Sequence, residues 1–203
     1  YHEASYIVPV SATSSSAVTQ SENLKKKLSE SQIVKGMFGD IKSKTKYNKE
    51  QWVINVGGKE ICIMPRGAGQ QVRGILYGDD RPNLIIVDDL EKSEEMRSKE
   101  QRDKIKEWFY ADLMNCVDRG GGGWKIIFIG TVLHEDSLLL ELKDNPAWKF
   151  ISLEICDDDF HSNAPNFMDD NQIKALYDSL AIVGQSDVFY REYRNIPTAK
   201  DNQ

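Results

Sequence analysis

The strongest constraint on the fold comes from two short apolar runs, Asn83–Asp89 (NLIIVDD) and Lys125–Thr131 (KIIFIGT). A strand with one exposed face alternates apolar and polar residues, whereas an unbroken run is typical of a strand buried on both faces of a parallel sheet. Parallel strands need long crossovers, and apolar residues recur at helical spacing among charges from Ser93 to Val117. We therefore predict an α/β protein whose mainly parallel sheet is flanked by helices.

Other segments fit the same fold class. Ser5–Val10 is apolar and predicts a further strand, and the hydroxyl side chains of Ser11–Ser16 are suitable N-caps for a helix that reaches about Leu28. Three more elements are predicted towards the C-terminus, namely a short strand at Lys149–Glu154 and helices near Asp169–Leu180 and Gln185–Tyr193.

A glycine pair marks a hairpin. Gly57 and Gly58 separate two β-rich runs, Trp52–Val56 and Glu60–Met64, and such a turn needs residues that accept positive φ. The segment Arg66–Gly74 that follows is too rich in glycine for regular structure and is predicted to be a loop.

Composition excludes several protein classes. The 203 residues contain no run long and apolar enough for a membrane span and no secretory signal, so we expect a soluble, intracellular protein. The spacing of Cys62, Cys116 and Cys156 fits neither zinc ligands nor a disulfide framework, which predicts buried thiols. The net charge is −6, but Ser21–Glu50 carries 8 lysines against 4 acids. That segment is either a phosphate-facing surface or an ordinary solvated face.

Polar residues end both buried runs, at the edge of a parallel sheet where ligands bind. Asp88 is suited to hold Mg²⁺, and Asp89 or Glu91 is suited to orient and deprotonate an attacking water. Thr131 ends the second run. The alternative interpretation is that Asp88 and Asp89 only cap the following turn.

Several motifs, in this order and spacing, together resemble the large terminase family of bacteriophages. They are Gly67–Gly74 (GAGQQVRG), Arg81–Glu91 (RPNLIIVDDLE), Trp108–Tyr110 (WFY), Ile127–Leu138 (IFIGTVLHEDSL) and Phe189–Pro197 (FYREYRNIP). The resemblance covers nearly the whole chain and is weakest before about Phe38. The family has a RecA-like ATPase domain of the P-loop NTPase type with a small lid, followed by an RNase H-like nuclease domain.

The resemblance implies an ATP hydrolase that uses Mg²⁺ and drives viral double-stranded DNA into a capsid. It also implies a homo-oligomeric ring docked on the portal protein, a small terminase subunit as partner, and a location in the host cytoplasm. Asp88 matches the Walker B aspartate and metal ligand, and Gly130 and Thr131 match the coupling segment that senses the γ-phosphate. Residues 1–164 are expected to form the ATPase core, residues 165–197 the helical lid, and residues 198–203 the start of a linker.

The chain departs from the family pattern in three ways. It contains no Gly-x-x-x-x-Gly-Lys-Ser/Thr, and Gly67–Gly74 has no lysine to grip a phosphate, so a Walker A loop is expected upstream of Tyr1 or is absent. Asp89 stands where the family often has glutamate, which leaves Asp89, slightly favoured, and Glu91 as candidate bases. Finally, no nuclease domain follows, so nuclease chemistry is expected to lie in other sequence.

Two further groups have competing interpretations. Arg73 lies in the glycine-rich segment, where it either acts as an arginine finger towards a neighbouring subunit or pairs with Asp79 or Asp80. The neighbouring residues His134, Glu135 and Asp136 suggest a metal site, but we expect them to cap a helix at Leu138–Leu142 instead.

Two other functions compete with an ATPase. An RNase H-like nuclease binds two metal ions through dispersed acids that converge on one site, whereas this chain offers one pair, Asp88 and Asp89. A degenerate ATPase fold without a phosphate-binding loop would act as a binding module without catalysis.

Overall fold

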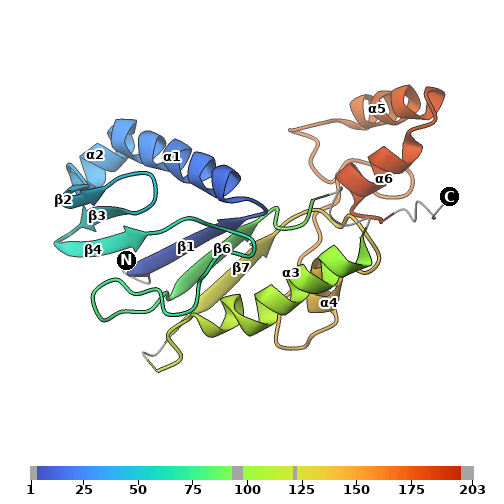
Figure 1. The fold of residues 1–203 in the computed structure, drawn as a ribbon. Helices are drawn as coiled ribbons and strands as arrows, with labels where there is room; N and C mark the ends of the chain where they lie inside the picture. The colour runs from blue at the N-terminus through green and yellow to red at the C-terminus, as the bar shows by residue number, and fades with distance from the viewer. Residues whose placement is uncertain (1–3, 93–97, 121–122, 198–203) are drawn as a thin grey trace. The chain divides into compact units, whose positions relative to one another are not determined.

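The computed structural model describes residues 4–92, 98–120 and 123–197 (Figure 1). The chain divides into two compact units. The first consists of Tyr1–Leu90 and Asp103–Ile129, and the second of Glu91–Arg102 and Gly130–Gln203.

The first unit is built on a mixed, mostly parallel sheet. Its strands are β1 (Tyr6–Ser11), β2 (Lys42–Tyr47), β3 (Trp52–Val56), β4 (Lys59–Ile63), β5 (Arg66–Gly67), β6 (Leu84–Asp88) and β7 (Lys125–Ile129). They lie in the order β2-β3-β4-β1-β6-β7, with β5 beside β1. Strands β4, β1, β6 and β7 are mutually parallel, and β2, β3 and β4 pair antiparallel. The predicted α/β class and the parallel pairing of the two apolar runs are confirmed.

Helix α1 (Ser14–Glu30) lies on one face of this sheet and helix α3 (Lys99–Ala111) on the other. The pairs Trp52↔Ile63, Ile7↔Ile63 and Ile7↔Leu84 place these residues on one face. Helix α1 lies on that side, where Trp52 Nε1 donates a hydrogen bond of 2.7 Å to Ser21 Oγ. We call this face of the sheet the α1 face.

The opposite side is the α3 face. Helix α3 (Lys99–Ala111) packs there, with the rings of Phe109 and Phe128 5.7 Å apart between centroids. Tyr6, Val8 and Val10 of β1 point to this face together with Ile85 and Val87 of β6, and all five are at most 1% exposed. The α3 face therefore forms the core of the first unit.

The predicted hairpin is confirmed. Strands β3 and β4 are joined by Gly57 and Gly58, whose φ angles are 59° and 83°. Two consecutive positive φ angles define the type I′ turn, whose twist matches that of the two strands, and they explain why glycine occupies both positions.

Some element boundaries differ from the sequence prediction. Helix α1 begins after the N-cap Thr13 and extends to Glu30, and α2 (Gln32–Phe38) and β2 follow it without having been predicted. The helix expected over residues 93–117 is shorter: α3 ends at Ala111 and a short 3-10 helix, Leu113–Asn115, continues the chain. The first part of the expected helix, residues 93–97, lies outside the described residues.

The predicted strand at Lys149–Glu154 is wrong. The segment has no regular structure, and Ile151 and Leu153 are 67% and 81% exposed. A strand needs a neighbouring strand for its backbone groups, and no described strand pairs with this segment. The carbonyls of Leu153 and Glu154 accept instead from the side-chain amides of Asn195 and Asn163. The end of the segment is also fixed by the amide of Ile155, which donates to Tyr193 O at 2.9 Å.

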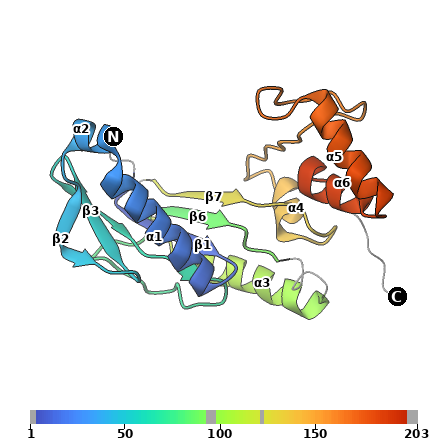
Figure 2. The same cartoon turned by 90° about the horizontal axis from the view of Figure 1, so that it is seen from above.

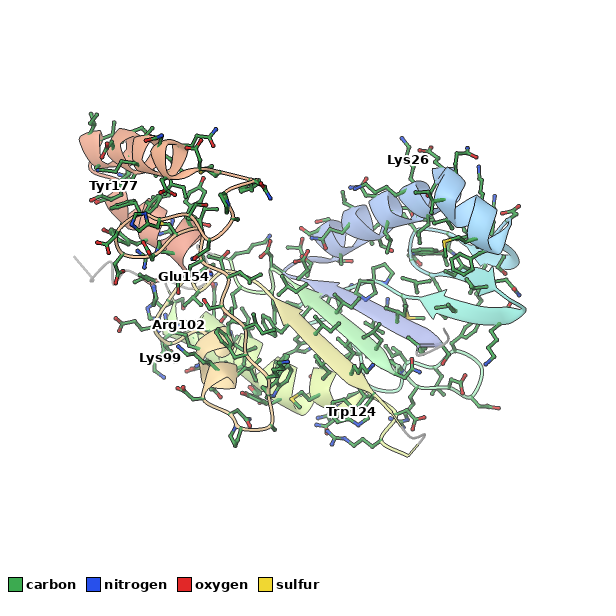
Figure 3. All side chains as sticks on the ribbon, turned by 180° about the vertical axis from the view of Figure 1, so that it is seen from behind. Lys26, Lys99, Arg102, Trp124, Glu154 and Tyr177 are labelled. Carbon is green, nitrogen blue, oxygen red and sulfur yellow. The ribbon has the colours of Figure 1, made fainter. Side chains whose placement is uncertain are left out.

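The second unit contains α4 (Leu138–Lys143), α5 (Asp170–Ile182) and α6 (Ser186–Arg194). The two last helices confirm the predicted helices after Pro165. An aromatic cluster holds them together. Phe189 is fully buried, and the centre of its ring lies 5.6 Å from that of Tyr193, on which it stacks, and 5.4 Å from that of Tyr177, which is labelled in Figure 3. The expected linker start, residues 198–203, lies outside the described residues.

Candidate functional site

The site is built on one edge of the sheet, where three parallel strands end. Val10 of β1 pairs with Val87 of β6, and Asp88 of β6 pairs with Ile129 of β7. The carboxyl ends of β1, β6 and β7 therefore meet at the same edge, which is where open α/β sheets bind their ligands.

Asp88 is the carboxylate at the end of β6. It is half-buried and points to the α1 face, where Gln20 of α1 donates a hydrogen bond of 3.0 Å from Nε2 to Asp88 Oδ2. The amide orients the carboxylate. Sequence reasoning missed Gln20, because the two residues are 68 positions apart and no local pattern links them.

Asp89 has a backbone conformation that few residues adopt. Its φ is 46°, in the left-handed region that costs most residues about 1–2 kcal/mol and that aspartate tolerates better than most. Two hydrogen bonds hold it there: its amide donates to Ile129 O at 3.1 Å, and its carbonyl accepts from Ala12 N at 3.3 Å. The residue is exposed. The turn after β6 is thus tied to both neighbouring strands.

Glu91, the other candidate base, is bound within the second unit. Its side chain is buried, and Oε1 accepts a hydrogen bond of 2.8 Å from the amide of Leu138, the first residue of α4. A carboxylate at a helix N-terminus satisfies an amide that has no partner inside the helix and interacts favourably with the helix dipole. The geometry of Glu91 is that of a structural acceptor.

The residues before α4 do not cap it as predicted. The N-cap is Ser137, whose hydroxyl accepts from Leu140 N at 3.3 Å. Asp136 pairs instead with Arg102 at 2.9 Å, and His134 Nδ1 accepts from Asp136 N. In the part of the chain that the structure describes, no three His, Cys, Asp or Glu side chains gather into a metal site.

Gly130 and Thr131 directly follow β7 and begin the later part of the second unit. Both are half-buried. Their position along the chain is the predicted one, immediately after the strand that neighbours β6.

Arg73 does not pair with Asp79 or Asp80. Its Nε lies 2.6 Å from Asp112 Oδ1, and the guanidinium also donates to the carbonyl of Ala111, the last residue of α3. The chain runs on from there to Asp118, whose amide donates to Pro82 O just before β6. Arg73 therefore lies towards the amino end of β6, and the structure does not bring it together with Asp88.

The lysine-rich segment is mostly solvated. Lys25 is buried and donates to Asn48 O at 3.2 Å, and its ammonium lies 4.9 Å from the centre of the Tyr47 ring. The exposed members are Lys26 (labelled in Figure 3), Lys27, Lys35, Lys42, Lys46 and Lys49. Because β2 is an edge strand, its lysines also discourage pairing with another sheet.

The cysteines are free and buried, as predicted. Burial is the main cause that raises the pKa of Cys116 to about 11, so its thiol stays protonated at neutral pH. None of the three is a reactive member of the site.

Comparison with protein-family models finds no match, and neither does comparison with curated protein sequences. No helix among the described residues combines the length and the apolar character needed to cross a bilayer.

Proposed function

We propose that the first unit carries part of the ATP-hydrolysing site of a DNA-packaging motor of the large terminase type, with a RecA-like core. The observation that carries the proposal is the position of Asp88. It ends a strand that lies between two parallel neighbours, and its carboxylate is oriented by Gln20. A strand-tip aspartate of this kind holds Mg²⁺ in P-loop NTPases.

In this proposal Asp88 binds Mg²⁺ and Asp89 is the general base. Asp89 is favoured over Glu91 because it is exposed at the sheet edge, whereas Glu91 is buried and accepts the Leu138 amide. Gly130 and Thr131 are assigned the coupling role because they follow the strand next to β6. ATP would supply the energy, and the motif resemblance supports double-stranded DNA as the translocated substrate, with α5 and α6 as the lid.

Arg73 enters the proposal only as a finger towards a neighbouring subunit. Its side chain is 61% exposed although it is tied to Asp112 and the end of α3. An exposed guanidinium can neutralise charge on a phosphate bound by another copy in a ring.

The proposal requires a phosphate-gripping loop from outside these residues, because none of the 203 positions begins a Gly-x-x-x-x-Gly-Lys-Ser/Thr sequence. We therefore expect the 203-residue chain alone to hydrolyse ATP poorly and the full-length protein to be active. Robust Mg²⁺-dependent turnover by the 203-residue chain would show that the nucleotide site lies elsewhere.

Nucleotide affinity and single-turnover rates in the full-length protein test the assigned roles. Asp88→Asn should weaken binding of Mg·ATP, since it removes a carboxylate from the metal. Asp89→Asn should leave binding nearly intact and slow the chemical step by roughly 10²–10⁴-fold, the usual effect of losing a positioned base. Glu91→Gln is the matched control, because its amide oxygen still accepts the Leu138 amide. Normal turnover in Asp89→Asn with slow turnover in Glu91→Gln would move the base to Glu91.

A further inference from the structure

Helix α2 presents an apolar stripe that the described chain leaves open. At helical spacing Ile33, Met37 and Phe38 fall on one side of this seven-residue helix, and they are 75%, 62% and 38% exposed. None of the seven residues is buried, and Figure 2 shows α2 at the end of α1, at the periphery of the first unit. Helices this short are stabilised mainly by the packing of an apolar face. The stripe therefore has the character of an interaction surface.

Lysines border the stripe. Lys26 and Lys27 are exposed near the end of α1, and Lys35 is exposed in α2 itself. The surrounding residues, 21–50, contain 8 lysines against 4 acids. An occupant that fits this surface brings an apolar group to the stripe and negative charge to its border. A second α2 does not fit, because its own lysines would meet these lysines across the contact.

The second unit of the same chain carries a surface with the opposite charge. Residues 130–197 contain 13 acids against 5 lysines and arginines. Five of these acids lie in residues 157–170, which contain neither lysine nor arginine and which we call the acidic segment. All five acids are exposed, and the segment also holds Phe167, whose ring is 76% exposed. An exposed aromatic side chain among acids matches an apolar stripe among lysines.

Hydrogen bonds within the acidic segment fix the turn that carries Phe167. Ser162 Oγ donates to Met168 O at 2.6 Å and accepts from Ala164 N at 3.1 Å. The amide of Phe167 itself donates to Ala164 O at 2.8 Å. The exposed ring is thus held on a turn that is already ordered, which reduces the conformational entropy lost when the ring binds to another surface.

We propose that copies of this chain associate head to tail. Phe167 of one copy packs on the α2 stripe of the next, and the acidic segment around it faces the lysines that border the stripe. Because the two surfaces differ, each pair of copies keeps one of each kind free, and the contact repeats along a series of copies. The proposal goes beyond nucleotide hydrolysis and does not depend on it.

Sedimentation velocity of the 203-residue chain tests the association. The sedimentation coefficient should rise with protein concentration, and association should weaken at about 1 M salt, where charges are screened over about 3 Å. Phe167→Ala and Ile33→Asp should each weaken association at least about tenfold, as expected for residues at the centre of a contact. Ile182→Ala is the matched control, because Ile182 is 85% exposed in the second unit but lies outside the acidic segment. A monomer at every concentration, or unchanged association of both variants, would overturn the proposal.

Mixing the two variants separates a head-to-tail contact from a symmetric one. The Phe167→Ala protein keeps an intact α2 stripe and the Ile33→Asp protein keeps an intact acidic segment, so the mixture should form a 1:1 complex that grows no further. Both side chains are exposed, so each variant should keep the melting temperature of the wild type. A mixture that stays monomeric would show that the two surfaces do not bind each other and that the proposal is wrong. ATP turnover enters neither readout, so the proposed function can fail independently.

Discussion

Replacing Gly67 by alanine should be among the most damaging small changes to the first unit. A Cβ at this position would lie 2.2 Å from the Ser14 amide nitrogen and 2.6 Å from the Thr13 carbonyl carbon, about 1 Å or more inside normal contact. Both neighbours are backbone at the start of α1, and Gly67 is itself paired with Ser11. Relief therefore requires β5 and α1 to separate. Overpacking costs about 1–3 kcal/mol, and a backbone clash belongs at the upper end.

A loss of about 3 kcal/mol lowers the melting temperature of a chain of this size by roughly 6–12 °C. Calorimetry or circular dichroism measures this directly. Gly36→Ala is the matched control, because a Cβ there meets nothing within 4 Å and the residue lies inside α2. It should be neutral or stabilise by about 0.5–1 kcal/mol. A Gly67→Ala protein that melts with the wild type would refute the close approach of β5 to α1.

Two further predictions concern hydrogen-bonded pairs. Ser21→Ala removes the acceptor of the buried Trp52 indole N–H and should cost about 1–3 kcal/mol in urea unfolding followed by fluorescence; an unchanged midpoint would contradict it. The hydrogen bond to Asp170, helped by the charges of Asp157 and Asp170, raises the pKa of His161. The pair therefore stabilises the fold fully below the pKa of histidine in the unfolded chain, about 6.5, and this stabilisation is lost as the pH rises through the higher pKa of His161 in the folded protein. An NMR titration should find this pKa lowered in Asp170→Asn.

The fold was predictable where the signal is local. Asn83–Asp89 and Lys125–Thr131 predict paired parallel strands by composition alone, and the glycine pair predicts its turn. The expectation that both strands are buried on both faces is wrong for β7, where Ile127 and Ile129 are 46% and 54% exposed. Strand β2 could not be predicted, because KSKTKY is polar and becomes a strand only through pairing with β3, as in Tyr47↔Trp52. The prediction for Lys149–Glu154 failed for the opposite reason: the segment has the composition of a strand, but no described strand lies beside it to pair with.

In the candidate site, too, the features set by local sequence were predicted, and the contacts between distant segments were not. The position of Asp88 at the sheet edge follows from a strand that ends there, and it was predicted. Its contact with Gln20 and the pairing of Arg73 with Asp112 depend on packing between distant segments, which no spacing encodes. Glu91 was a plausible base because it is close to Asp88 in sequence. In the structure the chain turns at Asp89, in a left-handed conformation, and Glu91 belongs to the second unit, where it accepts the Leu138 amide at the start of α4.

The route of the chain between the two units has a mechanical consequence. It crosses from one unit to the other after Leu90, after Arg102 and after Ile129. The first and third crossings follow β6 and β7, which are parallel and paired up to Asp88 and Ile129. Tension transmitted through these two segments would therefore enter both strands at their carboxyl ends. A load directed along the strands would put the hydrogen bonds between β6 and β1 in shear, so that several bonds are strained together and not one at a time. The end of the sheet that carries Asp88 is thus also the point at which force transmitted through these segments would act on the sheet.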